Sequence, residues 1–138
     1  MAVGFKVKYY WYQIGHGDFL HSFFSTVSYH LEPKGWGTEY PYLLNDLYKG
    51  KLENKNITNA IKELDEIKDK LKNYSPSQVV WDIDNLSKNP PWGDNISNDI
   101  TNLSNYFVTS EGEDLISLLR TALEKGLKTN SDVYIESL

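Results

Sequence analysis

Residues 57–71 read ITNAIKELDEIKDKL, and this stretch is the clearest amphipathic helix of the chain. Its hydrophobic residues recur every three or four positions, so on a helix they form one stripe, with the charged residues opposite. Glu66 and Lys70 stand in the order that favours an ion pair across one helical turn. The stripe consists of Ile57, Ala60, Ile61, Leu64, Ile67 and Leu71. Such a helix is stable only when its hydrophobic stripe is buried, so the stripe is predicted to face the hydrophobic core.

Two helices are expected before this stretch. Residues 19–31 have helical spacing, with Asp18 as a plausible N-cap, and Pro33 and two nearby glycines end the segment. Pro41 fits the first turn of a short helix that reaches Tyr48 and is closed by Gly50.

One helix is expected after it. Ser110 and Glu113 form a capping-box pattern, which predicts a helix from Asp114 to about Lys125 with Gly126 as its stop.

Strands are indicated where hydrophobic residues alternate with polar ones. Four segments show this pattern: 3–14, 78–83, 105–109 and 131–136. The expected order is therefore β-α-α-α-β-β-α-β. Because strands and helices do not alternate regularly, we predict one α+β domain over residues 1–138. It has a mostly antiparallel sheet of about four strands packed with three or four helices.

Composition restricts the class of protein. The 138 residues include no cysteine, which excludes disulfides, thiolate metal sites and cysteine nucleophiles. No segment approaches the 18 apolar residues of a membrane span, and the N-terminus does not resemble a signal peptide. A cytoplasmic location is the expectation.

Negative charge is concentrated in one segment. Residues 82–114 contain seven acidic residues against Lys88 alone, a net charge of −6, whereas residues 1–81 carry a net of +1. Nucleic-acid and anionic-membrane binders have basic surfaces, so neither ligand is expected. The segment suits a basic protein partner, or it is simply a solvated loop.

Catalytic motifs are absent from the sequence. It has no G-x-S-x-G, no phosphate-binding glycine loop and no HExxH. The remaining possibility of chemistry is a metal site grouping His16, Asp18 and His21, with Asp82 and Asp84. Neither the spacing of His16, Asp18 and His21 nor the Asp-x-Asp pair at 82 and 84 is specific for a metal ion. We therefore expect no enzyme activity, no cofactor and no metal.

Several runs together resemble the immunity protein 70 family. They are residues 23–29 (FFSTVSY), 37–41 (GTEYP), 79–83 (VVWDI), 90–93 (PPWG) and 101–109 (TNLSNYFVT). The resemblance covers roughly residues 9–123. It implies a bacterial antidote of a polymorphic toxin system, which binds a cognate toxin domain stoichiometrically and protects the producing cell.

The residues expected to bind the toxin lie in two loops. Interface energy concentrates in a few aromatic anchors surrounded by complementary charge. The 84–99 loop offers Trp92 at its centre, and the glycine-rich loop before residue 41 offers a second group. The candidates are Asp82, Asp84, Trp92, Asp94, Asp99, Trp36 and Tyr40.

The charge of the loop favours a basic toxin such as a nuclease. Trp92 has an alternative role as a lid over the core. A carbohydrate- or peptide-binding module and a small metal-dependent hydrolase remain alternative functions, and the sequence does not determine the oligomeric state.

Overall fold

Four strands form one antiparallel sheet in the order β2-β1-β4-β3. The computed structural model describes residues 2–137. Strand β1 is central and pairs with its hairpin partner on one side and with the C-terminal strand on the other. The strands are β1 (Ala2–Val7), β2 (Tyr10–His16), β3 (Lys51–Leu52) and β4 (Val133–Ser137).

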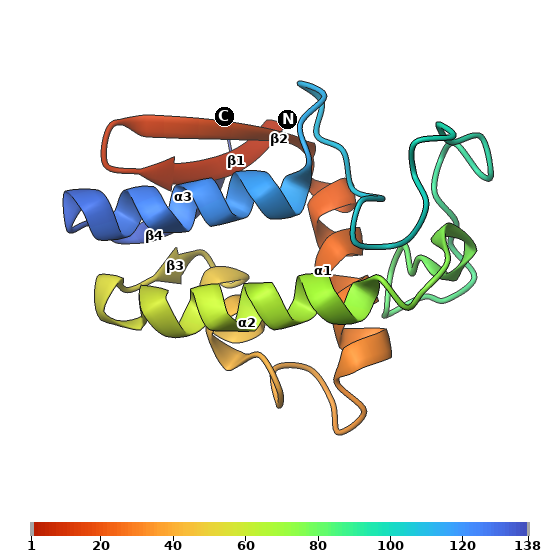
Figure 1. Ribbon diagram of the computed structural model, residues 1–138, viewed down its shortest axis with the longest axis horizontal. Coiled ribbons are helices and arrows are strands. Elements are labelled where there is room, and N and C mark those ends of the chain that lie inside the picture. Colours follow the sequence, from red (N-terminus) through yellow and green to blue (C-terminus); the bar gives the residue numbers. More distant parts are fainter. Residues whose placement is uncertain (1, 138) are drawn as a thin grey trace.

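Three main helices pack with this sheet (Figure 1). Helices α2 and α3 run side by side, and α3 packs on β1, β2 and β4. Helix α1 crosses the end of that pair, and the long loop before α3 lies on its far side (Figure 1). The helices are α1 (Gly17–Leu31), α2 (Ile57–Leu71) and α3 (Leu115–Thr129), with the short turns η1 (Tyr42–Leu47), η2 (Asn54–Asn56) and η3 (Pro76–Gln78). No helix within residues 2–137 is long and apolar enough to cross a membrane.

The α+β class with a four-stranded antiparallel sheet is therefore confirmed. Helix α2 has the bounds that its periodicity predicts, and its stripe is buried except for the partly exposed Ile61. The last strand is also confirmed, within two residues.

The order of elements differs from the prediction at the N-terminus. Residues 3–14 are expected to be one strand, but they form a hairpin with a two-residue turn at Lys8 and Tyr9. Lys8 has φ +56°, the left-handed conformation that such turns need and that Asn or Gly usually supplies. Because Lys and Tyr carry no turn signal, the alternation of residues runs through the bend without a break.

The two predicted strands in the middle of the chain are not strands. Of the predicted strand 78–83, Gln78 belongs to η3 and residues 79–83 lie against α1 without forming a strand. Residues 105–109 make only one isolated bridge, between Val108 and Asp114. The sheet still has four strands because the short strand β3, which was not predicted, pairs its two residues with β4.

Helix α3 begins as predicted but through a different cap. The Asp114 carboxylate accepts the amide of Ser117 at 2.9 Å, so the predicted box of Ser110 and Glu113 is not the cap. The helix ends at Thr129 rather than near Gly126, with Asn130 in the left-handed conformation at φ +54°.

Candidate functional site

The site begins with a polar strip on α1 that the apolar pattern of this helix conceals. Ser22, Ser25 and Thr26 are fully buried. The hydroxyls of Ser22 and Thr26 donate to the carbonyl of Val80 at 2.9 and 3.1 Å, and Thr26 also accepts the Val80 amide at 3.0 Å. Ser25 accepts the amide of Ile83 at 3.2 Å. These hydroxyls bind the backbone of residues 80–83 in place of a neighbouring strand, which fixes where Asp82 lies.

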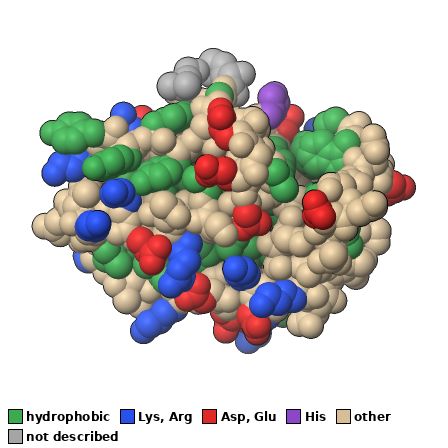
Figure 2. All heavy atoms as spheres, turned by 45° about the horizontal axis from the view of Figure 1, so that its top comes forward, with side chains coloured by type: hydrophobic (Ala, Val, Ile, Leu, Met, Phe, Trp, Pro, Cys, Tyr) green, Lys and Arg blue, Asp and Glu red, His purple; other side chains and the backbone are tan. Residues whose placement is uncertain are grey.

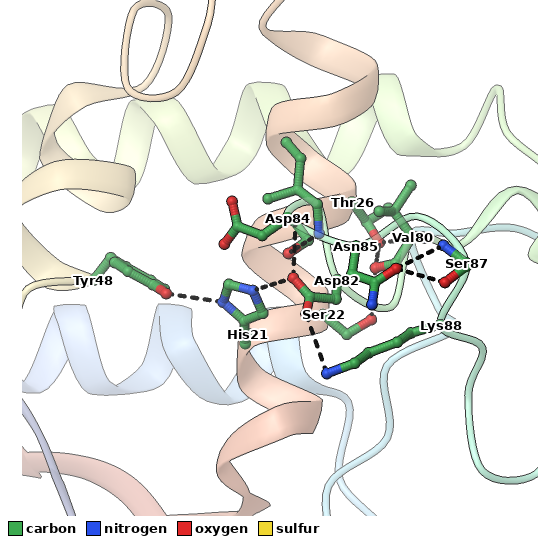
Figure 3. Close-up of polar contacts among 12 residues, drawn as sticks. His21, Ser22, Thr26, Tyr48, Val80, Asp82, Asp84, Asn85, Ser87 and Lys88 are labelled. Atoms are coloured by element: carbon green, nitrogen blue, oxygen red, sulfur yellow. Dashed lines mark hydrogen bonds and ion pairs between the residues drawn. The ribbon is translucent and has the colours of Figure 1, made fainter.

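His21 connects this segment to the other side of α1 (Figure 3). Its Nε2 is 3.1 Å from Asp82 Oδ1, and its Nδ1 is 2.8 Å from the Tyr48 hydroxyl. An ionised carboxylate can only accept, so Nε2 carries the proton; in the neutral ring Nδ1 then accepts from Tyr48. Both ring nitrogens are thus occupied, and the imidazole is held in one orientation.

The Asp82 carboxylate is fully engaged. The amide of Asp84 donates to it at 2.9 Å, His21 donates to the same oxygen, and Lys88 Nζ lies 3.7 Å from the other oxygen. The Asp84 amide and then His21 hold the pKa of Asp82 below its usual range. Asp82 therefore stays ionised and organises the start of the acidic loop.

A pocket of about 280 Å³ opens beside this group. It is lined by His21, Trp36, Tyr48, Ile83 and Asp84. The ring of Trp36 stacks on His21 at 6.4 Å and meets Tyr48 edge-on at 4.9 Å. Three segments far apart in the sequence therefore meet here, and two of them contain residues expected to bind the toxin.

Trp36 is held in place by a buried carboxylate. Glu32 is 3% exposed and accepts the amides of Gly37, Glu39 and Tyr40, each at 3.0 Å. A buried carboxylate needs such partners, and here they fix the whole glycine-rich loop. The indole of Trp36 in addition donates to a carbonyl of η1 at 2.7 Å.

A second glutamate holds the start of η1. Glu63 accepts the amides of Leu43 and Tyr42 at 3.0 and 3.3 Å. Burial raises the pKa of Glu63 to about 7; the two amides lower the pKa, while the negative charges of Glu32 and Asp46 add to the rise. Tyr48 directly follows η1 as its C-cap residue, so this contact also supports the pocket.

Tyr40 does not reach the surface. Its side chain is 1% exposed and belongs to the core. It was expected as a possible toxin contact, but its position supports the loop that carries Trp36.

Trp92 lies in an aromatic cluster and is also 38% exposed. Its indole donates to the Tyr106 hydroxyl at 2.8 Å, and its ring contacts Trp81 edge-on at 5.4 Å and Phe19 at 6.4 Å. It lines a cavity of about 320 Å³ together with Phe19 and Tyr106. Trp92 therefore covers part of the core, while the rest of its side chain remains accessible.

The remaining acidic candidates are exposed. Asp94 lines a neighbouring cavity of about 550 Å³. Asp99 makes local turn contacts with Ser97, and its backbone carbonyl accepts a hydrogen bond from the Asn105 side chain at 3.1 Å. Figure 2 shows red acidic side chains beside a hydrophobic patch at the loop end, on the right, while most blue side chains lie at the left and along the lower edge. The acidic segment is therefore displayed at the surface near accessible aromatic groups.

The possible metal group is only partly assembled. The ligand atoms of His21, Asp82 and Asp84 lie within 4.8 Å of one another. His16 and Asp18 instead pair with each other at the start of α1, where His16 rather than Asp18 is the N-cap. The five-residue group considered as an alternative is therefore not assembled as a whole, although three of its members do meet.

Sequence reasoning missed the connection of His21 and Tyr48 to the acidic loop. His21 is 61 positions from Asp82, and no local pattern links them. The hydroxyl residues within the apolar stripe of α1 are the one sequence signal for it, because buried hydroxyls on a core helix require partners.

One protein family matches this chain. The model of immunity protein 70 matches residues 5–135, nearly the whole sequence. No curated protein and no solved structure matches it. Immunity proteins are generally non-enzymatic inhibitors of toxins. The chain therefore belongs to the immunity protein 70 family, and its role is to neutralise a cognate toxin rather than to catalyse a reaction.

Proposed function

We propose that this chain binds a basic toxin domain, a nuclease, in a one-to-one complex formed in the cytoplasm. The observation that carries this proposal is the surface charge of residues 82–99. Asp84, Asp94 and Asp99 are all exposed there, against Lys88 as the only basic residue. A nuclease attracts phosphate through a basic groove, so an acidic surface beside an aromatic anchor is its electrostatic complement.

The proposed interface contains the exposed and half-buried candidates from both loops. Trp92 is the central anchor, because half-exposed tryptophans bury much area at little cost in side-chain entropy. Tyr40 contributes indirectly, through the position of its loop. The direct contacts are Asp82, Asp84, Trp92, Asp94, Asp99 and Trp36.

The experiment is co-expression with the toxin domain encoded beside this chain's gene, followed by purification and calorimetry at low and physiological salt. A one-to-one complex and restored growth are expected, together with an affinity that falls as salt rises. A nuclease assay on the purified toxin, with and without this chain, tests the activity that is blocked. A toxin that is acidic, or binding that does not change with salt, would contradict the electrostatic part of the proposal.

A further inference from the structure

We infer that the pocket between α1, η1 and the start of the acidic loop receives one cationic side chain of the toxin, an arginine or lysine that pairs with Asp84. The inference rests on the proposed function and specifies how part of that interface works. Its basis is the meeting of an unpaired carboxylate and two aromatic rings around one cavity of about 280 Å³.

Asp84 is the free charge of this pocket. Its backbone amide binds Asp82, but within residues 2–137 no hydrogen bond or ion pair engages its carboxylate (Figure 3). The neighbouring carboxylate of Asp82 is already satisfied by His21, Lys88 and the amide of Asp84 itself. An incoming cation therefore finds one carboxylate that needs no rearrangement to accept it.

The aromatic walls suit a guanidinium or ammonium group. Trp36 and Tyr48 border the same cavity as Asp84, and the face of an aromatic ring attracts a cation. Arginine also stacks on such rings while it binds a carboxylate through two parallel hydrogen bonds. Burial, followed by the charges of Asp84 and Asp82, raises the pKa of the Tyr48 hydroxyl, which is consistent with a negative potential at this place.

A metal ion fits the same residues less well. His21 Nε2 carries its proton towards Asp82, so it has no lone pair free for a metal unless the tautomer changes. Lys88 lies 3.7 Å from Asp82, where its positive charge opposes a metal cation. A cationic side chain needs neither His21 nor Asp82 as a ligand, because Asp84 and the rings are sufficient.

The test replaces the free carboxylate by its neutral isostere, Asp84→Asn. The matched control is Asp69→Asn, which removes the same charge from an exposed position on α2. Neither carboxylate has a partner within residues 2–137, so both variants are expected to fold. Against the toxin domain, calorimetry should show affinity reduced about 10-fold or more for Asp84→Asn, equivalent to about 1.4 kcal/mol, and nearly unchanged for Asp69→Asn.

A second arm needs no toxin. Methylguanidinium is titrated into the isotope-labelled protein, and amide and indole NMR signals are followed, with methylurea as the neutral control and Zn²⁺ as the competing cation. Shifts at Trp36 and Asp84 with methylguanidinium alone, lost in Asp84→Asn, support the pocket. Tight stoichiometric Zn²⁺ binding that broadens His21 would overturn it in favour of a metal site.

The outcomes separate the two proposals. If the wild type binds the toxin and Asp84→Asn binds equally well, the pocket is overturned while the immunity interface stands. If the wild type does not bind the toxin, the proposed function is wrong, and so is the inference that the pocket receives a side chain of the toxin. The methylguanidinium titration then still decides whether the pocket takes a cation.

Discussion

Glu63 shows how one buried carboxylate makes stability depend on pH. In the folded protein its pKa is raised to about 7 from a usual 4.5. Between these values the unfolded chain has lost the proton while the folded protein still holds it. Stability is therefore lost as pH rises through this window.

We predict that Glu63→Gln removes that loss. Glutamine presents an oxygen to the amides of Tyr42 and Leu43 without burying a charge. The variant should match the wild type near pH 4 and be more stable near pH 8 by about 2 kcal/mol, less than the full shift implies because solvent screens part of it. Urea unfolding at both pH values measures this, with the exposed Glu136→Gln as control. A variant less stable than the wild type near pH 8 would mean that the charge itself holds η1.

Two substitutions of Trp92 separate its packing role in the aromatic cluster from its proposed role as a toxin anchor. Trp92→Ala removes contacts with Phe19 and Trp81 and the hydrogen bond to Tyr106, so we expect a loss of about 2 kcal/mol in unfolding free energy together with weaker toxin binding. Trp92→Phe keeps a ring in the cluster and should recover most of the stability. If toxin affinity recovers fully as well, the lid role is sufficient and Trp92 is not an anchor.

Among the elements, α1 is the one that builds the site. Its buried hydroxyls replace a strand partner for residues 80–83, and its His21 holds Asp82. We predict that Thr26→Val, which keeps the shape but leaves the Val80 amide without its acceptor, lowers stability by about 1–3 kcal/mol.

Hydrogen exchange provides a local measurement of the same change. The Val80 amide should exchange faster in Thr26→Val, because it loses its hydrogen-bond acceptor. The α2 amides should exchange faster only by the amount that the lower free energy of unfolding accounts for. Thr58→Val, at an exposed position of α2, is the control. Unchanged exchange at Val80 would show that Thr26 does not hold this segment.

The same elements explain which structure could be predicted from sequence. α2 and α3 follow from local periodicity and end signals, so their existence is readable from the sequence alone. Residues 78–83 alternate as a strand does, but whether their backbone pairs with another strand or with hydroxyls of a helix is decided by contacts more than 50 positions away. β3 has two residues and exists only through its pairing with β4.

The candidate site likewise combines residues that the sequence identifies with contacts that only the fold creates. Composition and charge predict Asp82, Asp84 and Trp92 as surface features of the loop, and Asp84 and Trp92 are exposed in the structure. The pocket that joins Asp84 to Trp36 and Tyr48 is a product of tertiary packing, and no local pattern contains it. Tyr40 was placed with the surface group because an aromatic in a glycine-rich loop resembles a contact residue, whereas its loop folds inwards onto Glu32.

At the scale of the whole molecule, the position of charge matters more than its total. The net charge is −5, yet residues 82–114 alone carry −6, so the rest of the chain is close to neutral. Negative charge concentrated in one segment orients a basic partner before contact and raises the association rate.

We therefore predict that two variants of equal net charge differ in association. Asp84→Asn, Asp94→Asn and Asp99→Asn together remove three charges from the loop, whereas Asp69→Asn, Glu124→Gln and Glu136→Gln remove three from exposed positions on α2, α3 and β4. In stopped-flow mixing with the toxin domain at low salt, the loop variant should associate about 10-fold more slowly and the control variant only slightly more slowly. Near 1 M salt, where charges are screened beyond about 3 Å, the association rates should converge. Equal slowing in both variants would show that net charge alone steers the encounter, and the acidic loop would then lose its special role.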